Sequence, residues 1–531
     1  MQAFRRPRYI LLPHNNQKIP KNANLHTLHL SGIIACLIIL FNYDNASNIA
    51  ICYLFLPMLY FRRNKEKKEV YAMQNEKRPL DMLHGPIWNK LPRFALPVAA
   101  TAILEQLFNA SDIAVVGNFT GAEKTAAVAA VGANSPVIGL IVNLFIGIAL
   151  GANVVIAHAI GQKDNESVHK AVHTAVLVAL LGGVAVAILG ELAAAPLLGL
   201  LNVPDKVFPL ALLYLRIYLL GMPVILLYNF EAAIFRSIGE TKTPLLALTA
   251  SGILNVALNL FFVAVLHMTV NGVAIATVLS NAVSAVILYR KLRRSTREIR
   301  LDPRALRVDQ ASLKQILCIG LPAGVQSAVF ALSNIIVQSA INSLGTIVMA
   351  ASSAAFNIEV FTHDILNSFS QACTTFVGQN YGAGDVKRCR KTLALCLIEG
   401  AASLAVAITL ILCFGRNLLA IFNNDPEVVS TGMTRLVMIM LAHSFSLLYE
   451  VMSGYLRGFG ISLAPALLTM LGVCGVRISW IQLVFPHSRT FRTIMAAYPI
   501  SLSTTALMIF IALVCYRPSR RKAASAPAKS V

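Results

Sequence analysis

Three polar residues in one apolar stretch of the chain could bind a proton, an ion or a cationic substrate. Glu105, Asn109 and Asp112 stand at positions i, i+4 and i+7, which on a helix at about 100° per residue fall within roughly 60° of one another. Carboxylates are costly inside a membrane and are retained where they bind protons, ions or substrates. We therefore interpret Asp112 as a coupling group and Glu105 and Asn109 as residues of a binding cleft. The alternative for Asp112 is a hydrated acid near the end of its helix.

Neighbouring apolar stretches of the first half offer partners for Asp112. Asn255 and Asn259 are one helical turn apart, and Asn229 and Thr277 lie in the stretches on either side. Their amide and hydroxyl groups could share a proton or cation site with a carboxylate. In membrane helices such groups also serve as plain interhelical hydrogen-bonding groups. Both interpretations stay open for Asn229 and Thr277.

The second half of the chain has a polar group of its own. Glu359 and His363 are spaced i, i+4, Asp364 follows directly, and Glu450 lies in a later apolar stretch. Acidic groups of this kind suit a cationic, partly apolar substrate, so we interpret these four residues as cleft residues. Arg477 is a cation within an apolar stretch, and Glu450 is one candidate for its partner. A structural Arg–Glu pair that holds this half together is the alternative.

No motif in the sequence indicates a cofactor. The nine cysteines are scattered without a C-x-x-C pair, and we interpret them as small apolar residues of a reduced protein. The sequence contains no phosphate-binding glycine loop, zinc-ligand spacing or nucleophile motif, so ATP is excluded as a direct energy source within this chain. We expect no cofactor and no metal site, with only a proton or a sodium ion as a coupling ion.

Long apolar stretches must form the elements that carry these residues. Hydrophobic residues make up 56% of the 531 positions and charged residues 13%, whereas a soluble protein carries about 25% charged residues. Each stretch can supply the roughly 20 residues that a membrane-spanning helix needs. The sequence therefore predicts an all-α integral membrane protein with twelve transmembrane helices, near residues 92–117, 132–159, 170–196, 209–235, 244–267, 271–290, 316–342, 354–378, 392–414, 433–456, 464–485 and 493–516.

The two halves of the chain resemble each other at one constant shift. This shift pairs Gly161 with Gly382, Asp164 with Asp385, Arg236 with Arg457, Gly239 with Gly460 and Pro244 with Pro465, without a gap. Upstream, a slightly longer shift pairs Leu96-Pro97 with Leu321-Pro322. A duplicated apolar chain is typical of secondary transporters, in which two similar lobes flank a central site. We expect two six-helix lobes related by internal duplication, an N-lobe at 85–293 and a C-lobe at 316–517.

Basic residues are unequally divided between the two sides of this predicted bundle. The chain has a net charge of +21, and its Lys and Arg residues concentrate in loops 161–170, 236–243 and 382–391, the connector 294–315 and the tail 518–531. The opposite loops hold only Lys124, Lys206, Arg416, Arg435, Arg489 and Arg492. The positive-inside rule then predicts a multi-pass protein of the cell (inner or plasma) membrane, with both ends of the core in the cytoplasm.

The connector between the lobes is strongly basic. We interpret it as a solvated linker held near anionic lipid headgroups. It lacks the interleaved aromatic residues of a nucleic-acid-binding segment, so we expect no nucleic-acid partner.

Residues 1–84 form an N-terminal extension outside the duplication. Its two apolar runs, 31–41 and 48–60, are short for membrane spans, and no signal-peptide cleavage site follows them. We interpret residues 1–72 as upstream translation or as a dispensable, disordered segment. A membrane-attached hairpin is the alternative.

Several stretches between residues 85 and 517 resemble the multidrug and toxic compound extrusion (MATE) family of cation-coupled antiporters. They are Leu96-Pro97 through Asp112 and Gly117, Tyr214-Leu215-Arg216-Ile217 with Gly221-Met222-Pro223, the loop from Arg236 to Pro244, and Gly378-Gln379-Asn380-Tyr381-Gly382-Ala383-Gly384. The resemblance implies a V-shaped pair of six-helix lobes. It also implies efflux of organic, often cationic, compounds driven by an inward flux of protons or sodium.

The same resemblance places Asp112, Asn229, Asn255 and Thr277 at the family's first-lobe cation and proton positions. Asn259 departs from the pattern, because many bacterial members carry a second Asp there. Fewer charged oxygens disfavour a hard ion such as sodium. We therefore expect a proton-coupled antiporter that works as a monomer among membrane lipids and exports small organic cations, with sodium coupling as the alternative.

Other classes of membrane protein differ in what they would require. A flippase of lipid-linked precursors shares the two-lobe architecture and would be favoured by a cleft lined with Arg or Lys. An integral membrane enzyme would need a clustered catalytic set at one membrane face, which the sequence does not contain. A channel would need a filter-like segment that interrupts the spans.

Overall fold

Helices form wherever a long apolar stretch lies between polar breaks. In the first half they are α4 (Leu91–Phe119), α5 (Lys124–Gln162), α6 (Asn165–Leu200), α7 (Phe208–Leu220), α8 (Met222–Ser237), α9 (Lys242–Asn259) with the π-helix η2 (Leu260–Val265), and α10 (Val270–Arg294). The computed structural model describes residues 80–121, 124–201 and 203–517. The expectations for residues 1–72 and for the tail 518–531 lie outside this range.

The second half repeats the pattern. A 3-10 turn, η3 (Pro303–Ala305), lies in the connector, and the helices that follow are α11 (Gln310–Asn342), α12 (Thr346–Gly382), α13 (Val386–Phe422), α14 (Pro426–Gly458), the series α15 (Leu463–Thr469), η4 (Met470–Gly475) and α16 (Val476–Leu483), the turn η5 (Phe485–His487), and α17 (Phe491–Tyr516). Each of the twelve predicted spans corresponds to one helix or one continuous series, which confirms the all-α prediction.

Most of these helices are apolar enough to cross a membrane. Among the described residues, nine pass on length and hydropathy alone, and α7 with α8, bent by 50° at Gly221, can form a tenth span. Pro223 lies at the start of α8, where its missing N–H breaks the helical ladder. The remaining two, α4 and α12, carry the acidic residues Glu105, Asp112, Glu359 and Asp364.

The duplication is visible in the turns between helices. Asp164 caps α6 by accepting a hydrogen bond from the Ser167 backbone N–H at 3.1 Å, and Asp385 caps α13 in the same way at 2.9 Å. Hydrogen bonds from Ser167 hold the pKa of the Asp164 carboxyl below its usual value. The residues one position earlier, Lys163 and Gly384, both adopt left-handed backbone with φ of 58° and 79°.

Two helices pass from the core of one lobe to the core of the other. Near its start α4 places Leu91 and Phe94 among second-lobe residues, with the rings of Phe94 and Phe376 5.9 Å apart. Farther along, Val116 packs in the first-lobe core. The start of α11 likewise packs Ile316 into a first-lobe core. Pro97 and Pro322 lie within these helices, and proline allows a helix to bend between its two environments.

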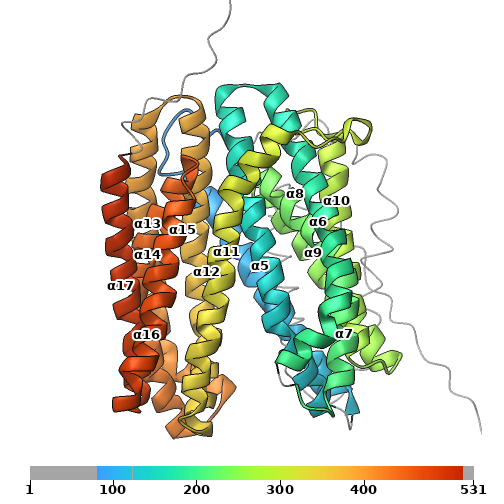
Figure 1. Cartoon of the computed structure of the whole chain (residues 1–531), viewed down its shortest axis with the longest axis vertical. Coiled ribbons are helices and arrows are strands. Elements are labelled where there is room, and N and C mark those ends of the chain that lie inside the picture. The colour runs from blue at the N-terminus through green and yellow to red at the C-terminus, as the bar shows by residue number, and fades with distance from the viewer. Residues whose placement is uncertain (1–79, 122–123, 202, 518–531) are drawn as a thin grey trace, which may run out of the picture. The chain divides into compact units, whose positions relative to one another are not determined.

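The lobes meet along α5, which packs against α11 and α12. A Cβ on Gly147 would lie 2.2 Å from the backbone N of Gly324, and one on Gly382 would lie 2.2 Å from the carbonyl O of His158. Only glycine permits such close approach of two backbones. In Figure 1 α5 and α11 lie side by side at the centre, between the first-lobe and the second-lobe helices.

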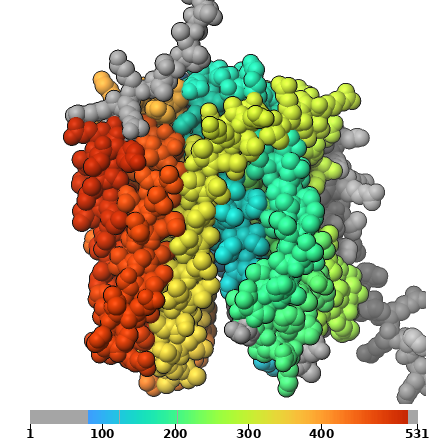
Figure 2. All heavy atoms as spheres, viewed as in Figure 1, coloured from blue at the N-terminus to red at the C-terminus, as the bar shows by residue number. Residues whose placement is uncertain are grey.

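More contacts between the lobes lie at what we call the basic end, which carries loops 161–170, 236–243, 382–391 and the connector. Gln379 donates a hydrogen bond to the Ser237 carbonyl at 2.6 Å, and the His158 ring bonds to the Gly458 carbonyl at 2.7 Å. In the space-filling view the helices part at the opposite end, where a cleft opens between the yellow and the green segments (Figure 2).

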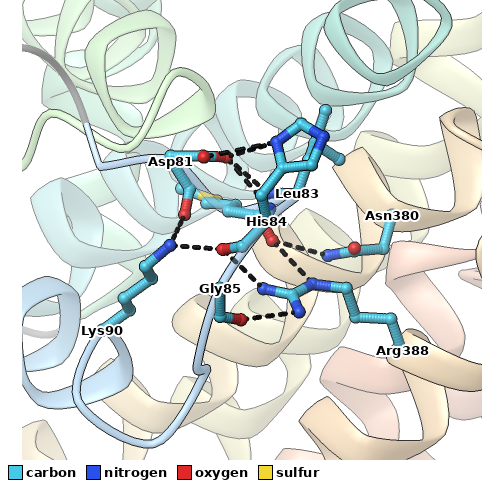
Figure 3. Close-up of polar contacts among 8 residues, drawn as sticks. Asp81, Leu83, His84, Gly85, Lys90, Asn380 and Arg388 are labelled. Atoms are coloured by element: carbon cyan, nitrogen blue, oxygen red, sulfur yellow. Dashed lines mark hydrogen bonds and ion pairs between the residues drawn. The ribbon is translucent and has the colours of Figure 1, made fainter.

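The segment before α4 fastens onto this basic end (Figure 3). Arg388 donates hydrogen bonds to the carbonyl oxygens of Met82, His84 and Gly85 at 2.8–3.2 Å. Asn380 also donates to Met82 O, at 3.2 Å. The Met82 side chain is 1% exposed. Residues 80–90 therefore form part of the packed core.

The connector differs from the solvated linker that its charge predicts. Ile299 and Leu301 are each 1% exposed and belong to a first-lobe core. Arg297 forms an ion pair with Glu240 at 2.8 Å, and the Asp309 backbone N–H donates to Thr174 Oγ1 at 3.0 Å. The connector contains apolar residues between its basic ones, and these pack into the first-lobe core. A prediction based on the number of charges alone does not take them into account.

Candidate functional site

Asp112 is held in the interior of the first lobe by donors from two other helices. Its side chain is 6% exposed. The Asn259 amide of α9 donates to Asp112 Oδ1 at 2.5 Å, and the Thr277 hydroxyl of α10 donates to Asp112 Oδ2 at 3.1 Å. Asn255 accepts a hydrogen bond from Asn259 at 3.2 Å and donates to Thr277 at 3.4 Å. The structure thus brings together four of the five predicted coupling residues in one network.

One acceptor of this network is left without a partner. Asn259 is fully buried, and among the described residues no donor reaches its Oδ1. An amide can present either its NH₂ or its oxygen to a neighbour. Asn259 can therefore donate to a charged Asp112 or, after its amide turns over, accept from a protonated one.

Asn229 and Asn109 lie apart from this network. The Asn229 amide donates to the Ile225 carbonyl of its own helix at 2.9 Å and makes no bond to Asp112. Asn109 is exposed, although the spacing places it on the same stripe as Asp112. Asp112 lies on the buried side of α4 with Val115 and Val116, and Asn109 lies outside it.

Glu105 lies between the lobes. It is half-buried on α4 and interacts electrostatically with Arg236 of α8 and with Asp364 of α12. Arg236 in turn donates to Gln371 Oε1 of α12 at 2.7 Å, which links the two lobes. Asp364 is 8% exposed, and its Oδ2 has no hydrogen-bond partner among the described residues. Two acids from opposite lobes therefore share one region.

Glu359 is not available to a ligand, although its position in the sequence suggested a cleft residue. It receives a bidentate pair from Arg435 of α14, with Nε to Oε2 at 3.0 Å and Nη2 to Oε1 at 2.5 Å. Both side chains are almost completely buried, at 9% and 3% exposure. The charge of Glu359 is thus already neutralised. His363, one turn further along α12, is half-buried.

The proposed pairing of Arg477 with Glu450 is wrong. Glu450 instead lies 3.7 Å from Arg457, which follows it by about two helical turns on the same helix. Arg477 donates to the Ser501 hydroxyl at 3.0 Å and lies 4.2 Å above the Tyr498 ring. Two apolar stretches that follow each other in the sequence need not present their polar residues to each other, so the pairing could not be read from proximity in the chain.

Two buried charged residues were not predicted from the sequence. Arg435 was assigned to an outer loop, because charged residues usually mark the ends of spans, but α14 continues through it. Glu231 of α8 is fully buried, and neither carboxylate oxygen has a partner among the described residues. Its position inside the predicted span 209–235 was the available signal for an intramembrane acid.

No metal site accompanies these groups in the part of the chain that the structure describes, since no cluster of three His, Cys, Asp or Glu side chains could hold an ion. The geometry of the first lobe offers one carboxylate, two amides and one hydroxyl. Such a set can take up and release a proton, or hold a cation with a single formal negative charge.

Comparisons with known proteins agree with this architecture. The family model described as MatE matches residues 97–261 and 322–481, one segment in each lobe. "Probable multidrug resistance protein YoeA" of Bacillus subtilis is 25% identical over 435 residues, covering 80% of this chain and 93% of that protein. "Probable multidrug resistance protein NorM" of Thermotoga maritima is 26% identical over 400 residues, covering 74% and 84% respectively.

Solved structures show the same fold. A structure titled "Outward-facing conformation of a multidrug resistance MATE family transporter of the MOP superfamily" matches with a TM-score of 0.76 at 22% identity. It covers 84% of this chain and 99% of that one. A MOP superfamily transporter from Pyrococcus furiosus matches with a TM-score of 0.77, also at 22% identity.

Proposed function

Because this chain belongs to the MatE family of multidrug efflux transporters, we propose that it is an antiporter that exports organic cations in exchange for protons. Transport follows an alternating-access cycle in which the two lobes open first to one side of the membrane and then to the other. The protein is a multi-pass membrane protein, and we place it in the cell membrane with its basic end in the cytoplasm.

The observation that carries the proton assignment is the network around Asp112. A single carboxylate accepts from Asn259 and from Thr277, and the amide of Asn259 can serve either protonation state of Asp112. Proton exchange needs one group that is stable in both states. A sodium ion prefers several charged or carbonyl oxygens, and within this network only Asp112 carries a formal charge.

The acids between the lobes support a cationic substrate. Glu359 and Glu450 are paired with arginines, which leaves Glu105 and Asp364 to attract an organic cation in the space between the lobes. Arg236 lies within electrostatic range of Glu105 and donates a hydrogen bond to Gln371 of the other lobe. We propose that a bound cation competes with Arg236 for Glu105 and so weakens this link between the lobes.

The state of the molecule fits an outward-open step of the cycle. Contacts close the basic end, and the cleft lies at the opposite end. Small organic substrates would enter from the cytoplasm only after the basic end opens. We expect each chain to work as a monomer surrounded by lipid. The multidrug-resistance names of the relatives do not favour the flippase alternative.

Proteoliposomes with purified full-length protein test the coupling ion directly. An imposed pH gradient in sodium-free buffer, with the membrane potential clamped, should drive movement of a fluorescent organic cation. Protein-free vesicles give the background, and a protonophore should abolish the signal. Transport that requires a sodium gradient and ignores the pH gradient would overturn the proton assignment while leaving the export of cations intact.

A further inference from the structure

A second charged centre lies inside the second lobe, and it has the opposite sign from the Asp112 network. Two guanidinium groups contact the same aromatic ring, since Arg477 Cζ lies 4.2 Å and Arg435 Cζ lies 5.8 Å from the centroid of Tyr498. Both arginines are 2% exposed. The shared ring therefore brings two buried guanidinium groups into one region of the lobe, of which Arg435 is paired with Glu359.

The positive charge of Arg477 is not neutralised. Each nearby glutamate already has its own arginine, because Glu359 pairs with Arg435 and Glu450 with Arg457. Within residues 80–121, 124–201 and 203–517, no carboxylate lies within ion-pair distance of the Arg477 guanidinium. Its neutral contacts are the Ser501 hydroxyl and a long 3.5 Å bond to Asn334 Oδ1. A buried cation inside a membrane protein normally has an anionic partner or water.

An unsatisfied histidine lies within electrostatic range of this cation. His443 of α14 is 7% exposed, and its Nδ1 has no hydrogen-bond partner among the described residues. Both guanidiniums and His363 act electrostatically on its ring. In the tautomer that carries a proton on Nδ1, His443 has a donor without an acceptor. A buried cation without an acid and a buried ring nitrogen without a partner are two separate observations in this region.

The internal duplication gives this centre its place in the fold. The shift that pairs Arg236 with Arg457 also places Tyr498 at the position of Thr277, and Arg435 at that of Tyr214. Thr277 donates to Asp112, and Tyr214 lies within its electrostatic range. Equivalent positions thus surround a carboxylate in one lobe and guanidinium groups in the other.

The second lobe lacks the carboxylate itself. The slightly longer shift that pairs Pro97 with Pro322 places Val337 where Asp112 stands in the first lobe. Val337 is 1% exposed and packs in the second-lobe core. The negative charge of the first lobe therefore has no counterpart in the chain at the equivalent place.

We propose that the second lobe binds a small monovalent anion between Arg477 and His443, beside Tyr498, the counterpart of Thr277 in the first lobe. The shared chemistry is one negative charge that accepts hydrogen bonds from a guanidinium and an imidazole N–H. A chloride ion supplies it, and so does a carboxylate group on an exported compound. This proposal does not depend on proton coupling, because its groups lie in the other lobe.

Thermal unfolding of the full-length protein in detergent tests the anion directly. Sodium chloride is exchanged for sodium methanesulfonate at constant sodium concentration and ionic strength, since methanesulfonate is a monovalent anion too large for a buried site. Saturating chloride should raise the unfolding temperature of the wild type by roughly 2–4 °C. A second arm replaces chloride with formate, a carboxylate smaller than methanesulfonate.

Variants of Arg477 and His443 test whether these residues cause the anion-dependent rise in unfolding temperature. Arg477→Gln and His443→Phe should each abolish the anion-dependent rise, and Arg477→Lys should retain part of it. Arg216→Gln removes an arginine that pairs with Glu191 outside this centre and should respond like the wild type. His443→Phe keeps a planar ring and removes no charged group, so it keeps the test valid where Arg477→Gln fails to fold.

The outcomes distinguish chloride from a carboxylate of an exported compound as the source of the negative charge. A rise with chloride that the His443→Phe variant loses supports a halide site, and a rise with formate alone supports a carboxylate subsite for exported compounds. Equal unfolding temperatures in all three anions, or an anion effect unchanged in both variants, would overturn the proposal. In that case Arg477 is held by its aromatic and hydroxyl contacts alone.

Discussion

At the scale of single residues, each lobe contains a buried carboxylate in a different setting. Asp112 is surrounded by neutral groups that can follow its protonation state, whereas Glu359 is fixed by a bidentate arginine. The first arrangement allows a change of charge, and the second opposes it. A carboxyl group is therefore assigned to coupling by its partners rather than by its presence in a span.

Replacement of Asp112 by Asn should abolish coupled transport without preventing folding. Asn preserves the shape of the side chain but can neither carry a proton nor compensate a cation. Efflux of a fluorescent cationic dye should fall to the level of protein-free vesicles, while the unfolding temperature stays within a few degrees of the wild type. Asp205→Asn makes the same change at an exposed position and should leave efflux unchanged. Undiminished efflux by Asp112→Asn at wild-type expression would falsify the assignment.

Replacement of Asn259 by Asp should move the first lobe toward sodium. A second carboxylate beside Asp112 raises the formal negative charge that a hard cation requires. We expect sodium to stabilise this variant against unfolding and to enter the transport cycle, whereas the wild type is indifferent to sodium. Asn229→Asp adds the same charge on α8, away from the network, and serves as the control. If both variants respond alike, the effect belongs to total charge and not to this site.

Loss of Arg435 should destabilise the second lobe strongly. It leaves Glu359 buried without a partner, which costs about 3–5 kcal/mol for a pair of this kind. Thermal unfolding of Arg435→Gln should therefore occur at a clearly lower temperature. The double variant Arg435→Gln/Glu359→Gln, in which no charge remains, should recover most of the loss. A double variant as unstable as the single one would show that the arginine acts through packing.

At the scale of helices, the sequence predicts the elements better than their contacts. Apolar length gives the twelve spans, and the constant shift pairs Asp164 with Asp385, which the structure shows capping equivalent helices. The crossing of α4 between two cores could not be predicted, because Phe94 is apolar and suits either lobe. Likewise the resemblance places Asn255 and Thr277 beside Asp112, as observed. It also places Asn229 there, but Asn229 donates to a carbonyl of its own helix instead.

The close approach of α5 and α12 makes Gly382 sensitive to the smallest side chain. A Cβ there would lie 2.2 Å from the His158 carbonyl oxygen, which is backbone and cannot move aside alone. Gly382→Ala should therefore lower the unfolding temperature and reduce transport. Gly199→Ala is the matched control, because no heavy atom lies within 4 Å of its Cβ; replacing a helical glycine there should be neutral or stabilise by up to about 1 kcal/mol. Similar behaviour of both variants would contradict the packing argument.

At the scale of the whole molecule, alternating access requires that the basic end opens. The bond between Gln379 and the Ser237 carbonyl joins the lobes there, so a covalent bridge at this place should stop transport. We expect a short thiol-specific cross-linker to inactivate the Ser237→Cys/Gln379→Cys variant, and a cleavable linker to restore activity after reduction. Among the described residues the accessible native cysteines are Cys318, Cys413 and Cys515, and these are first replaced by Ser together with Cys36 and Cys52.

A bridge within one lobe provides the control for this experiment. Thr243 of α9 and Lys291 of α10 contact each other inside the first lobe, and Thr243→Cys/Lys291→Cys should remain active after cross-linking. Activity that survives the bridge between Ser237 and Gln379 would mean that these residues stay together throughout the cycle.

The crossing of α4 also constrains how the chain is assembled during synthesis. Leu91 and Phe94 leave the ribosome early, yet their packing partners include Phe376. Likewise the carbonyl of Met82 accepts a hydrogen bond from Asn380, which is synthesised 298 residues later. The first helix must therefore remain in the membrane with one half unpacked until the second lobe has been inserted. Neither half can mature alone, and a chain interrupted in the connector would regain its structure only when both fragments are made together.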